Sequence, residues 1–408
     1  MGKAWRICVP VLSCMLAGCF DDSYGGGDVG DNTGFDPPVP VLVEIASPEQ
    51  SKGSGPVDDM SLEGGKSIYV YAFNADMLSS YAVKASDDRV NTLLDGSVDR
   101  PGTKAGRRAV TYPRGGTLKW ADASRVMFYH DGDMKQIPYE FYAYYMDDVD
   151  VSEDDYVRTD DAVRINVEID GRQDLMTSKA ELTDAQLETF GSEEQERLVE
   201  YSYSYYSGLR NVLPRFSFRH HLARLEFEVS PGYVAGIVKN ITVQSVEVES
   251  KYRAVFTVAE RSSPSQLGLS FPEGDGEELY RNFVLREADG SPVPDGKYSF
   301  STLSDPYEVP RKIPMGGSLL VAPQKDSLIA YVTVKETRED GAVLASARNR
   351  IALKYTQGSG FGSFDAGNMY RIKLQVFGIT TVNTSVTMEP WRSGGNIMVD
   401  TEDDRPEI

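Results

Sequence analysis

The sequence predicts an all-β protein made of sandwich domains with short peripheral helices, and three observations support that prediction. Apolar residues recur at every second position through most of the chain. Turn-forming pairs such as Asp170-Gly171 and Asp340-Gly341 interrupt these segments, and only one region has the periodicity of a helix. Alternation gives each strand one apolar and one polar face, so that two layers of strands can close around a shared core.

The alternation is clearest at 225–229 and 370–376, where apolar and polar residues take turns. Ile241 and Val243 are in phase with each other, whereas Val246 and Val248 are shifted by one residue. This shift predicts a β-bulge near Gln244-Ser245 that restores the core-facing side. Further strands are predicted at 41–45, 68–73, 139–145, 163–169, 318–322, 328–334 and 382–388.

From Thr183 to Tyr205 the periodicity is helical. Thr183 with Gln186 and Ser192 with Gln195 each have the spacing of a capping box, so we expect two short helical turns here. We interpret them as the end of a first domain, after which Leu213-Pro214 opens a second. The predicted β-sandwich domains are therefore residues 41–212 and 213–408.

The N-terminus carries the pattern of an exported lipoprotein. Residues 1–18 have a basic start, a short apolar stretch and small residues before a cysteine, which is typical of a signal peptide. Leu16-Ala17-Gly18-Cys19 is a lipobox, which predicts that Cys19 receives a diacylglycerol with its palmitate-type chains. Residues 19–40 are rich in Gly and Asp and are expected to form a flexible acidic tether. Asp21 and Asp22, just after Cys19, resemble the export signal of lipoproteins that are sent to the outer face of an outer membrane.

Cysteine use and charge exclude several kinds of chemistry. Cys8 and Cys14 leave with the signal peptide, so the mature chain keeps only the lipidated Cys19 and has no disulfide or thiol nucleophile. The net charge is −20, which disfavours binding to nucleic acid. We expect no cofactor, no metal site and no catalytic residues, and no later segment is apolar for long enough to cross a membrane.

Two further patterns each allow a metal and a structural interpretation. His220 and His221 lie within a predicted strand, where a buried, hydrogen-bonded histidine is favoured over a metal ligand. The acidic run 147–155 has enough carboxylates to gather a calcium ion, but it lacks the glycine and glutamate of an EF-hand loop, which favours a solvated loop.

Two other patterns suggest ligand sites. Gly358 to Gly362 is glycine-rich but lacks the flanking strand and helix of a dinucleotide site, so a hairpin or loop is expected. The tyrosines at 201, 203, 205 and 206 are able to form a sugar-stacking platform, although an interdomain seam is favoured.

Four segments in order resemble the Bacteroidales fimbrillin family. They are Gln173-Asp174-Leu175-Met176, the Phe-x-Phe-x-His-His-Leu-Ala-Arg-Leu core of 216–229, Leu319-Leu320-Val321-Ala322-Pro323-Gln324, and Phe364-Asp365-Ala366-Gly367-Asn368-Met369-Tyr370 leading to Pro390-Trp391. The resemblance implies two transthyretin-like β-sandwich domains. It also implies a subunit of a surface pilus, the fimbrium, that functions in adhesion and is polymerised by strand exchange with other pilus subunits.

In that family a trypsin-like protease removes the N-terminal strand together with its lipid, and a strand of a neighbouring subunit takes its place. Here the exchanged strand is expected to be Val41, Leu42, Val43, Glu44 and Ile45. The candidate processing residues are Lys52, Arg89, Arg100 and Arg108.

The loop-like stretch 100–108 lies further along the chain than the family pattern implies. Residues 396–399 are the one strand-like piece in the short tail that is available as a donor. A tip, anchor or accessory subunit that keeps its lipid is therefore an alternative to a stalk subunit.

Two other classes of protein stay open at this stage. A surface lipoprotein of the outer membrane that binds glycans for polysaccharide uptake would share the anchor, the acidity and the β-domains. A hydrolase would need paired carboxylates or a triad, and no recognisable catalytic motif is present. A host protein or a host glycan is the expected kind of adhesion ligand.

Overall fold

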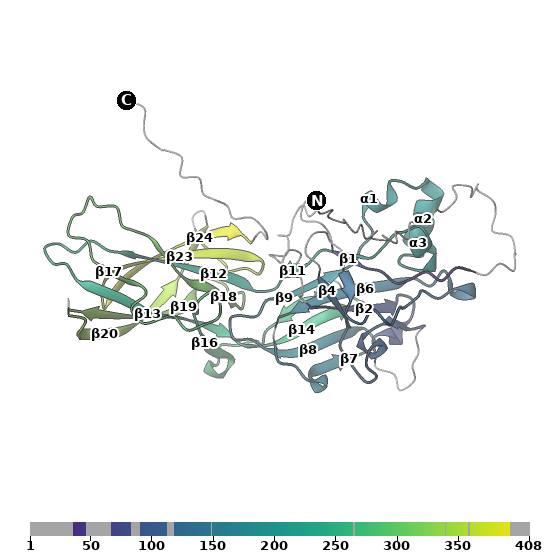
Figure 1. Cartoon of the computed structure of the whole chain (residues 1–408), viewed down its shortest axis with the longest axis horizontal. Helices are drawn as coiled ribbons and strands as arrows, with labels where there is room; N and C mark the ends of the chain where they lie inside the picture. Colours follow the sequence, from purple (N-terminus) through teal and green to yellow (C-terminus); the bar gives the residue numbers. More distant parts are fainter. Residues whose placement is uncertain are drawn as a thin grey trace, which may run out of the picture. The chain divides into compact units, whose positions relative to one another are not determined.

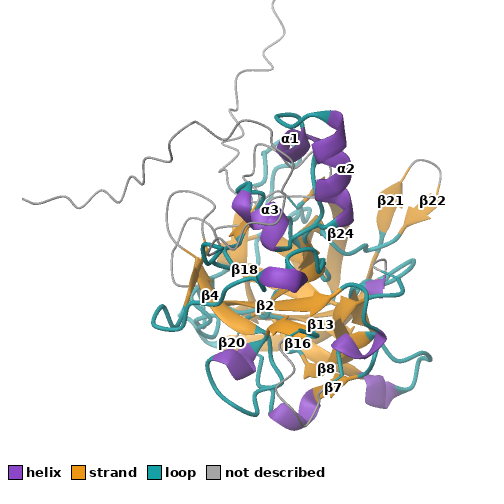
Figure 2. Cartoon of the chain, turned by 90° about the vertical axis from the view of Figure 1, so that its right-hand side faces the viewer, coloured by secondary structure: helices purple, strands orange, loops and turns teal. Residues whose placement is uncertain are grey.

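Strands make up most of the regular structure of this computed structural model, which confirms the all-β prediction (Figure 2). The structure describes residues 36–45, 67–82, 90–111, 118–147, 149–263, 266–338, 340–357 and 360–391. The chain divides into two units, 1–37 and 38–408, and all the helices and strands described belong to the second. The predicted signal peptide, Cys19, most of the tether, Lys52, Arg89 and 396–399 lie outside the described residues. Within the described ranges, no helix has the length and apolar composition needed to cross a bilayer.

The first sheet has seven strands in the order β11-β9-β6-β2-β4-β5, with β3 paired to β2 (Figure 1). Its strands are β2 (Ser67–Asn74), β3 (Thr92–Leu94), β4 (Arg107–Thr111), β5 (Leu118–Trp120), β6 (Tyr139–Met146), β9 (Leu175–Lys179) and β11 (Arg219–His220). The central strands β2 and β6 are buried on both faces. Their sequences are therefore nearly continuous apolar and aromatic runs instead of strict alternations.

The second sheet has four strands in the order β15-β14-β8-β7. They are β7 (Tyr156–Arg158), β8 (Ala162–Glu168), β14 (Arg253–Glu260) and β15 (Gly268–Ser270). Aromatic side chains join this sheet to the first one. Tyr144 of β6 meets Phe256 of β14 edge to face, with the ring centroids 6.1 Å apart.

The third and fourth sheets contribute to the same core as the first two. The third has the order β18-β12-β23-β24, and the fourth has the order β16-β13-β19-β20 with β17 paired to β13. The third comprises β12 (Ala223–Pro231), β18 (Ile313–Val321), β23 (Asn368–Gly378) and β24 (Thr381–Pro390). The fourth comprises β13 (Asn240–Lys251), β16 (Tyr280–Val284), β17 (Ser299–Ser301), β19 (Leu328–Thr337) and β20 (Val343–Leu353).

Two details of these sheets confirm the sequence predictions. The register of β13 against β19 shifts between Val243 and Ser245, which is the predicted bulge. Residues 360–362 of the glycine-rich stretch form β22 (Gly360–Gly362), which pairs antiparallel with β21 (Tyr355–Gln357).

The helical region has three short helices where two were predicted. They are α1 (Asp184–Leu187), α2 (Ser192–Glu200) and α3 (Tyr205–Leu209). The capping box of Thr183 and Gln186 is confirmed. The box predicted for Ser192 and Gln195 is wrong, because Gly191 is the N-cap of α2 and the Gln195 amide donates to the carbonyls of Leu187 and Phe190 instead.

Strand pairing crosses the predicted domain boundary at 212/213. β14 and β15 follow this boundary in sequence, yet β14 pairs with β8 of the second sheet. β11 likewise pairs with β9 of the first sheet. The division at residue 213 stays a prediction.

Truncating Phe256 tests the shared core. Its ring is fully buried, so Phe256→Ala should lower the free energy of unfolding by about 3–5 kcal/mol through lost transfer free energy and a residual cavity. Phe361→Ala is the matched control, because that ring is 59% exposed and its loss should change stability by less than about 0.5 kcal/mol. Urea denaturation measures both. Equal effects would contradict the assignment of Phe256 to the core.

Candidate functional site

The N-terminal segment 39–45 lies on the face of the first sheet that is turned away from the second sheet. Val39, Val41, Val43 and Ile45 are all buried there, while Leu42 between them is 46% exposed. Alternate side chains therefore enter a second hydrophobic core. This core also contains Ile68, Val70, Leu118, Phe141, Tyr203 and Phe216.

Few backbone hydrogen bonds hold this segment. Val41 N donates to Met127 O at 2.8 Å, Tyr129 N donates to Val39 O at 2.9 Å, and Glu44 N donates to Pro214 O at 2.9 Å. Only β1 (Glu44–Ile45) is regular, in a parallel pair with β10 (Arg215–Phe216). The prediction of a strand over 41–45 is thus correct for its last two residues. Residues 41–43 run beside the irregular loop around Met127, which cannot offer a continuous ladder.

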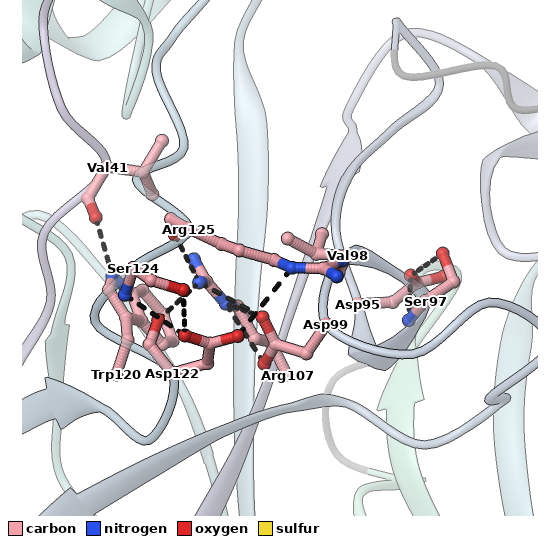
Figure 3. A network of polar contacts seen from close by, with 10 residues as sticks. All are labelled: Val41, Asp95, Ser97, Val98, Asp99, Arg107, Trp120, Asp122, Ser124 and Arg125. Carbon is pink, nitrogen blue, oxygen red and sulfur yellow. Dashed lines mark hydrogen bonds and ion pairs between the residues drawn. The ribbon is translucent and has the colours of Figure 1, made fainter.

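A buried polar network attaches the segment to the first sheet (Figure 3). Trp120, the last residue of β5, donates its indole Nε1–H to Val41 O at 3.0 Å. The guanidinium carbon of Arg107 lies 4.6 Å from the centroid of the Trp120 ring, in a cation–π contact. The position of Trp120 therefore depends on Arg107, and the backbone of Val41 depends on Trp120.

Arg107 is fully buried and is balanced by one carboxylate. Its Nη2 lies 3.1 Å from Asp99 Oδ1 and donates to the carbonyl oxygens of Asp122 and Arg125. A second arginine joins the segments on either side of Arg107, because Arg125 Nη1 donates to Val98 O (Figure 3). A buried cation is tolerated only with such partners, because its desolvation is costly.

The structure places two of the predicted processing residues. Arg100 is exposed in a turn, where Thr103 N donates to its carbonyl at 3.2 Å. Arg108 is exposed on β4, opposite Tyr69 of β2. The loop predicted over 100–108 is therefore wrong at its end, because Arg107 and Arg108 begin a strand that lies between β2 and β5. In the described part of the chain, Arg108 bonds to Ser67 and Arg100 accepts from Thr103 N, and neither of these bonds reaches segment 39–45.

Trp120 and Arg107 are the residues that sequence reasoning missed. Nothing in the sequence separates Arg107 from the exposed arginines near it, since it is directly followed by Arg108, which is exposed. The one available signal was the Leu118-Lys119-Trp120 alternation, in which a tryptophan next to a strand end requires a partner for its N–H.

The two histidines have structural roles on β11 and next to it. His220 Nδ1 lies 2.8 Å from Asp174 Oδ2, and its ring stacks on Trp391 with the centroids 3.7 Å apart. His221 Nε2 lies 2.7 Å from Thr177 Oγ1. Burial, with the charges of His220 and Arg219, lowers the pKa of His221 to about 4. Gly268, at φ 120°, approaches this ring so closely that a Cβ would lie 2.4 Å from His221 Nδ1.

The remaining candidate patterns have local explanations. In the acidic run, the Asp155 carboxylate caps the backbone of Ser152, and Glu153 accepts from Lys104 N. Tyr203 and Tyr205 are buried in the second core, and the interdomain seam favoured for the four tyrosines stays a prediction. Among the described residues, no group of three or more His, Cys, Asp or Glu side chains is placed to hold a metal ion.

Comparison with known proteins identifies the class to which this arrangement belongs. A family model described as fimbrillin-like matches residues 57–391. The protein is a member of the fimbrillin-like family, as the sequence motifs suggested. No curated protein matches the chain.

Solved structures of similar proteins include a candidate cell adhesion protein from Bacteroides uniformis, at 14% identity over 87% of this chain and 98% of that one, with a TM-score of 0.44. A fimbrilin from Porphyromonas gingivalis is 9% identical over 88% of this chain and 98% of that one, with a TM-score of 0.37. The fimbrial anchor protein Mfa2 from the same organism is 11% identical over 86% of this chain and 98% of that one, with a TM-score of 0.30.

Removing the partner of Arg107 tests the network. Asp99→Ala should lower the free energy of unfolding by about 3–5 kcal/mol, because it leaves a buried guanidinium without its counter-charge. Glu193→Ala removes the partner of Arg197, whose ion pair is exposed, with the glutamate side chain 83% accessible, and should cost only about 0.3–0.5 kcal/mol. Chemical denaturation compares the two variants. A small loss for Asp99→Ala would show that Arg107 is held by its carbonyl partners alone.

The lowered pKa of His221 predicts a dependence of stability on pH. The unfolded chain binds a proton near pH 6.5 and the folded chain only near pH 4, so stability is complete above the first value and decreases as the pH falls between the two. Between about pH 7 and about pH 5 the loss should be roughly 2 kcal/mol. His221→Gln should remove this part of the slope, whereas His130→Gln should keep it. Urea midpoints at both pH values provide the measurement, and identical slopes in all three proteins would refute the prediction.

Proposed function

We propose that this protein is a subunit of a cell-surface pilus, exported as a lipoprotein through Cys19 and joined to other pilus subunits by strand exchange. Membership of the fimbrillin-like family supports the pilus role. The lipobox supports attachment to the outer membrane through a lipid on Cys19. A stalk subunit would lose this lipid on processing, and a tip or anchor subunit would keep it. No catalytic role is part of the proposal.

The observation that carries the strand-exchange proposal is the way segment 39–45 is held. Four alternate side chains enter the second core, and burying them contributes about 6–12 kcal/mol before conformational entropy is subtracted. That amount is comparable with the whole net stability of a typical domain. If the segment leaves, the exposed groove needs another strand with the same alternation.

The segment is also separable from the rest of the sheet. Its backbone hydrogen bonds go to the loop around Met127 and to residues 214–216. Its regular part, β1, pairs with β10 and is not a strand of the first sheet. An incoming strand would need four alternating apolar residues and a carbonyl at the position of Val41 O, to accept from Trp120. Strand addition of this kind satisfies both the open core and the unpaired backbone groups.

Among the predicted processing residues, we propose Lys52. A cut there would free 39–45 and leave every strand from β2 onward in the main chain. Cuts at Arg89, Arg100 or Arg108 would also detach β2, which pairs with both β4 and β6 in the middle of the first sheet. Loss of a central strand is incompatible with a folded product.

The glycan-uptake alternative has less support. It called for a platform of exposed aromatic rings, and the tyrosines considered for it include Tyr203 and Tyr205, each only 2% exposed.

Limited proteolysis with a lysine-specific protease tests the proposal. We expect a new N-terminus between residues 46 and 67, loss of 39–45 from the folded product, and growth of oligomers seen by light scattering. Lys52→Gln should block the cut and the oligomers. Replacing the lysine-specific protease with trypsin, which also cuts after arginine, should give the same new N-terminus, and Arg100→Gln should leave that trypsin product unchanged.

Lys66 is the other lysine between segment 39–45 and β2. Lys66→Gln therefore separates the two sites, because it should leave the cut and the oligomers unchanged, whereas the double variant Lys52→Gln/Lys66→Gln should behave like Lys52→Gln. A trimmed product that stays monomeric, or a protein that resists the protease, would contradict strand exchange and favour a tip or anchor subunit that keeps its lipid.

A further inference from the structure

A cavity of about 200 Å³ lies between the turn that follows β8 and the edge strand β16. Its walls come from two short stretches, 169–172 and 281–286. Three arginines line it: Arg172, Arg281 and Arg286. The chain as a whole has a net charge of −20. A cavity lined by three arginines is therefore unusual for a protein of this acidic composition.

The turn that forms one wall is fixed on β16 by close packing. Gly171 has a φ of 95°, and a Cβ at this position would lie 2.9 Å from Cβ of Phe283. Its carbonyl accepts from Leu320 N at 2.8 Å, and Asp170 N donates to Gln173 Oε1 at 2.9 Å. The neighbouring Asp170 and Arg172 are thus presented from a defined backbone, which reduces the entropy lost when a ligand binds.

Two of the arginines are oriented by neighbours. Arg172 bonds to both oxygens of Asp170, with its Nη2 2.6 Å from Oδ2. The guanidinium of Arg281 lies 3.7 Å from the centroid of the Tyr252 ring, and its Nη1 lies 3.3 Å from Glu168 Oε2. Glu168 also accepts from Arg253 Nε at 2.7 Å, so one carboxylate serves two cations.

Arg286 differs from the other two. Its Nη1 donates to Gly290 O at 3.3 Å, and within the described ranges no carboxylate lies at ion-pair distance from it. Its side chain borders the cavity next to Val284, which is 47% exposed. The remaining donors of this guanidinium are available to a ligand.

The carboxylates of this region stay ionised at neutral pH. The hydrogen bond from Arg253 lowers the pKa of Glu168. Burial alone would raise the pKa of Asp170, but the hydrogen bonds and charge of Arg172 outweigh burial and lower it. Arg172 is paired with Asp170, and Arg253 and Arg281 share Glu168. On the neighbouring strand β13, Glu247 and Glu249 lie opposite Val284 and Asn282. Arg286 is therefore the lining arginine whose charge is left for a ligand.

We propose that this cavity binds an acidic sugar unit, a hydroxylated ring that carries one carboxylate. The ligand's carboxylate would pair with Arg286 and Arg281, since guanidinium groups bind carboxylates through paired, charge-assisted hydrogen bonds. The ring hydroxyls would donate to Asp170 and exchange hydrogen bonds with Asn282, while Val284 packs against the ring.

The mixture of donors and acceptors favours a sugar over an acidic peptide. The carboxylate of an acidic side chain accepts hydrogen bonds only, so it would use the arginines and leave the Asp170 carboxylate without a donor. A ring with several hydroxyls uses that same carboxylate as an acceptor. The inference goes beyond the assembly role and does not depend on it, because a single unassembled chain contains the complete cavity.

Titration calorimetry with the purified full chain tests the proposal. Glucuronate is the probe, glucose is its neutral match, and N-acetylglutamate amide supplies a carboxylate without a hydroxylated ring. We expect glucuronate to bind and both other compounds to bind at least about tenfold more weakly, which corresponds to about one charge-assisted hydrogen bond. Binding of glucuronate should weaken further as salt is added.

Variants locate the site on the protein. Arg286→Gln and Arg281→Gln should each weaken glucuronate binding by about tenfold or more. Arg350→Gln is the matched control, an exposed arginine on β20 at the opposite edge of the same sheet, and should leave binding unchanged. Equal binding of glucose would overturn the role of charge, and equal binding of N-acetylglutamate amide would assign the cavity to acidic peptides. No binding of glucuronate, or binding insensitive to both arginines, would overturn the site itself.

Discussion

The first sheet is buried on both of its faces, and most of the architecture follows from that constraint. One face packs against the second sheet through rings such as Tyr144 and Phe256. The other face needs a separate cover, because β2 and β6 present apolar side chains on both sides and a sheet face of that composition is not stable in water. Segment 39–45 and the residues around α3 supply this cover.

That cover is attached by polar groups as well as by packing. The path from Asp99 through Arg107 and Trp120 to the carbonyl of Val41 connects a loop ion pair to the backbone of the covering segment. Buried polar networks of this kind specify one arrangement among several of similar hydrophobic content. Apolar side chains alone would allow the segment to slide by two residues, and a single carbonyl aligned with the indole N–H fixes its register.

Much of the fold was predictable from local pattern, whereas most of the site was not. Alternation at 225–229 and the phase shift around Gln244 identified strands and a bulge, because both depend on neighbours in sequence. The failures involve partners distant in sequence. Residues 41–43 are extended but lack a ladder, since their neighbour in space is the loop around Met127. Arg107 is buried because Asp99, Trp120 and two carbonyls converge on it, and no local pattern records that convergence.

The path of the chain between its sheets has a mechanical consequence. After β12 and β13 the backbone returns to the second sheet as β14 and β15, then leaves again for β16. The first two sheets are therefore completed by strands from both sides of position 213, because β14 pairs with β8 and β11 pairs with β9. A pulling force applied at the two ends cannot extract one half as an intact module, so tension would be borne by β-ladders of both halves together.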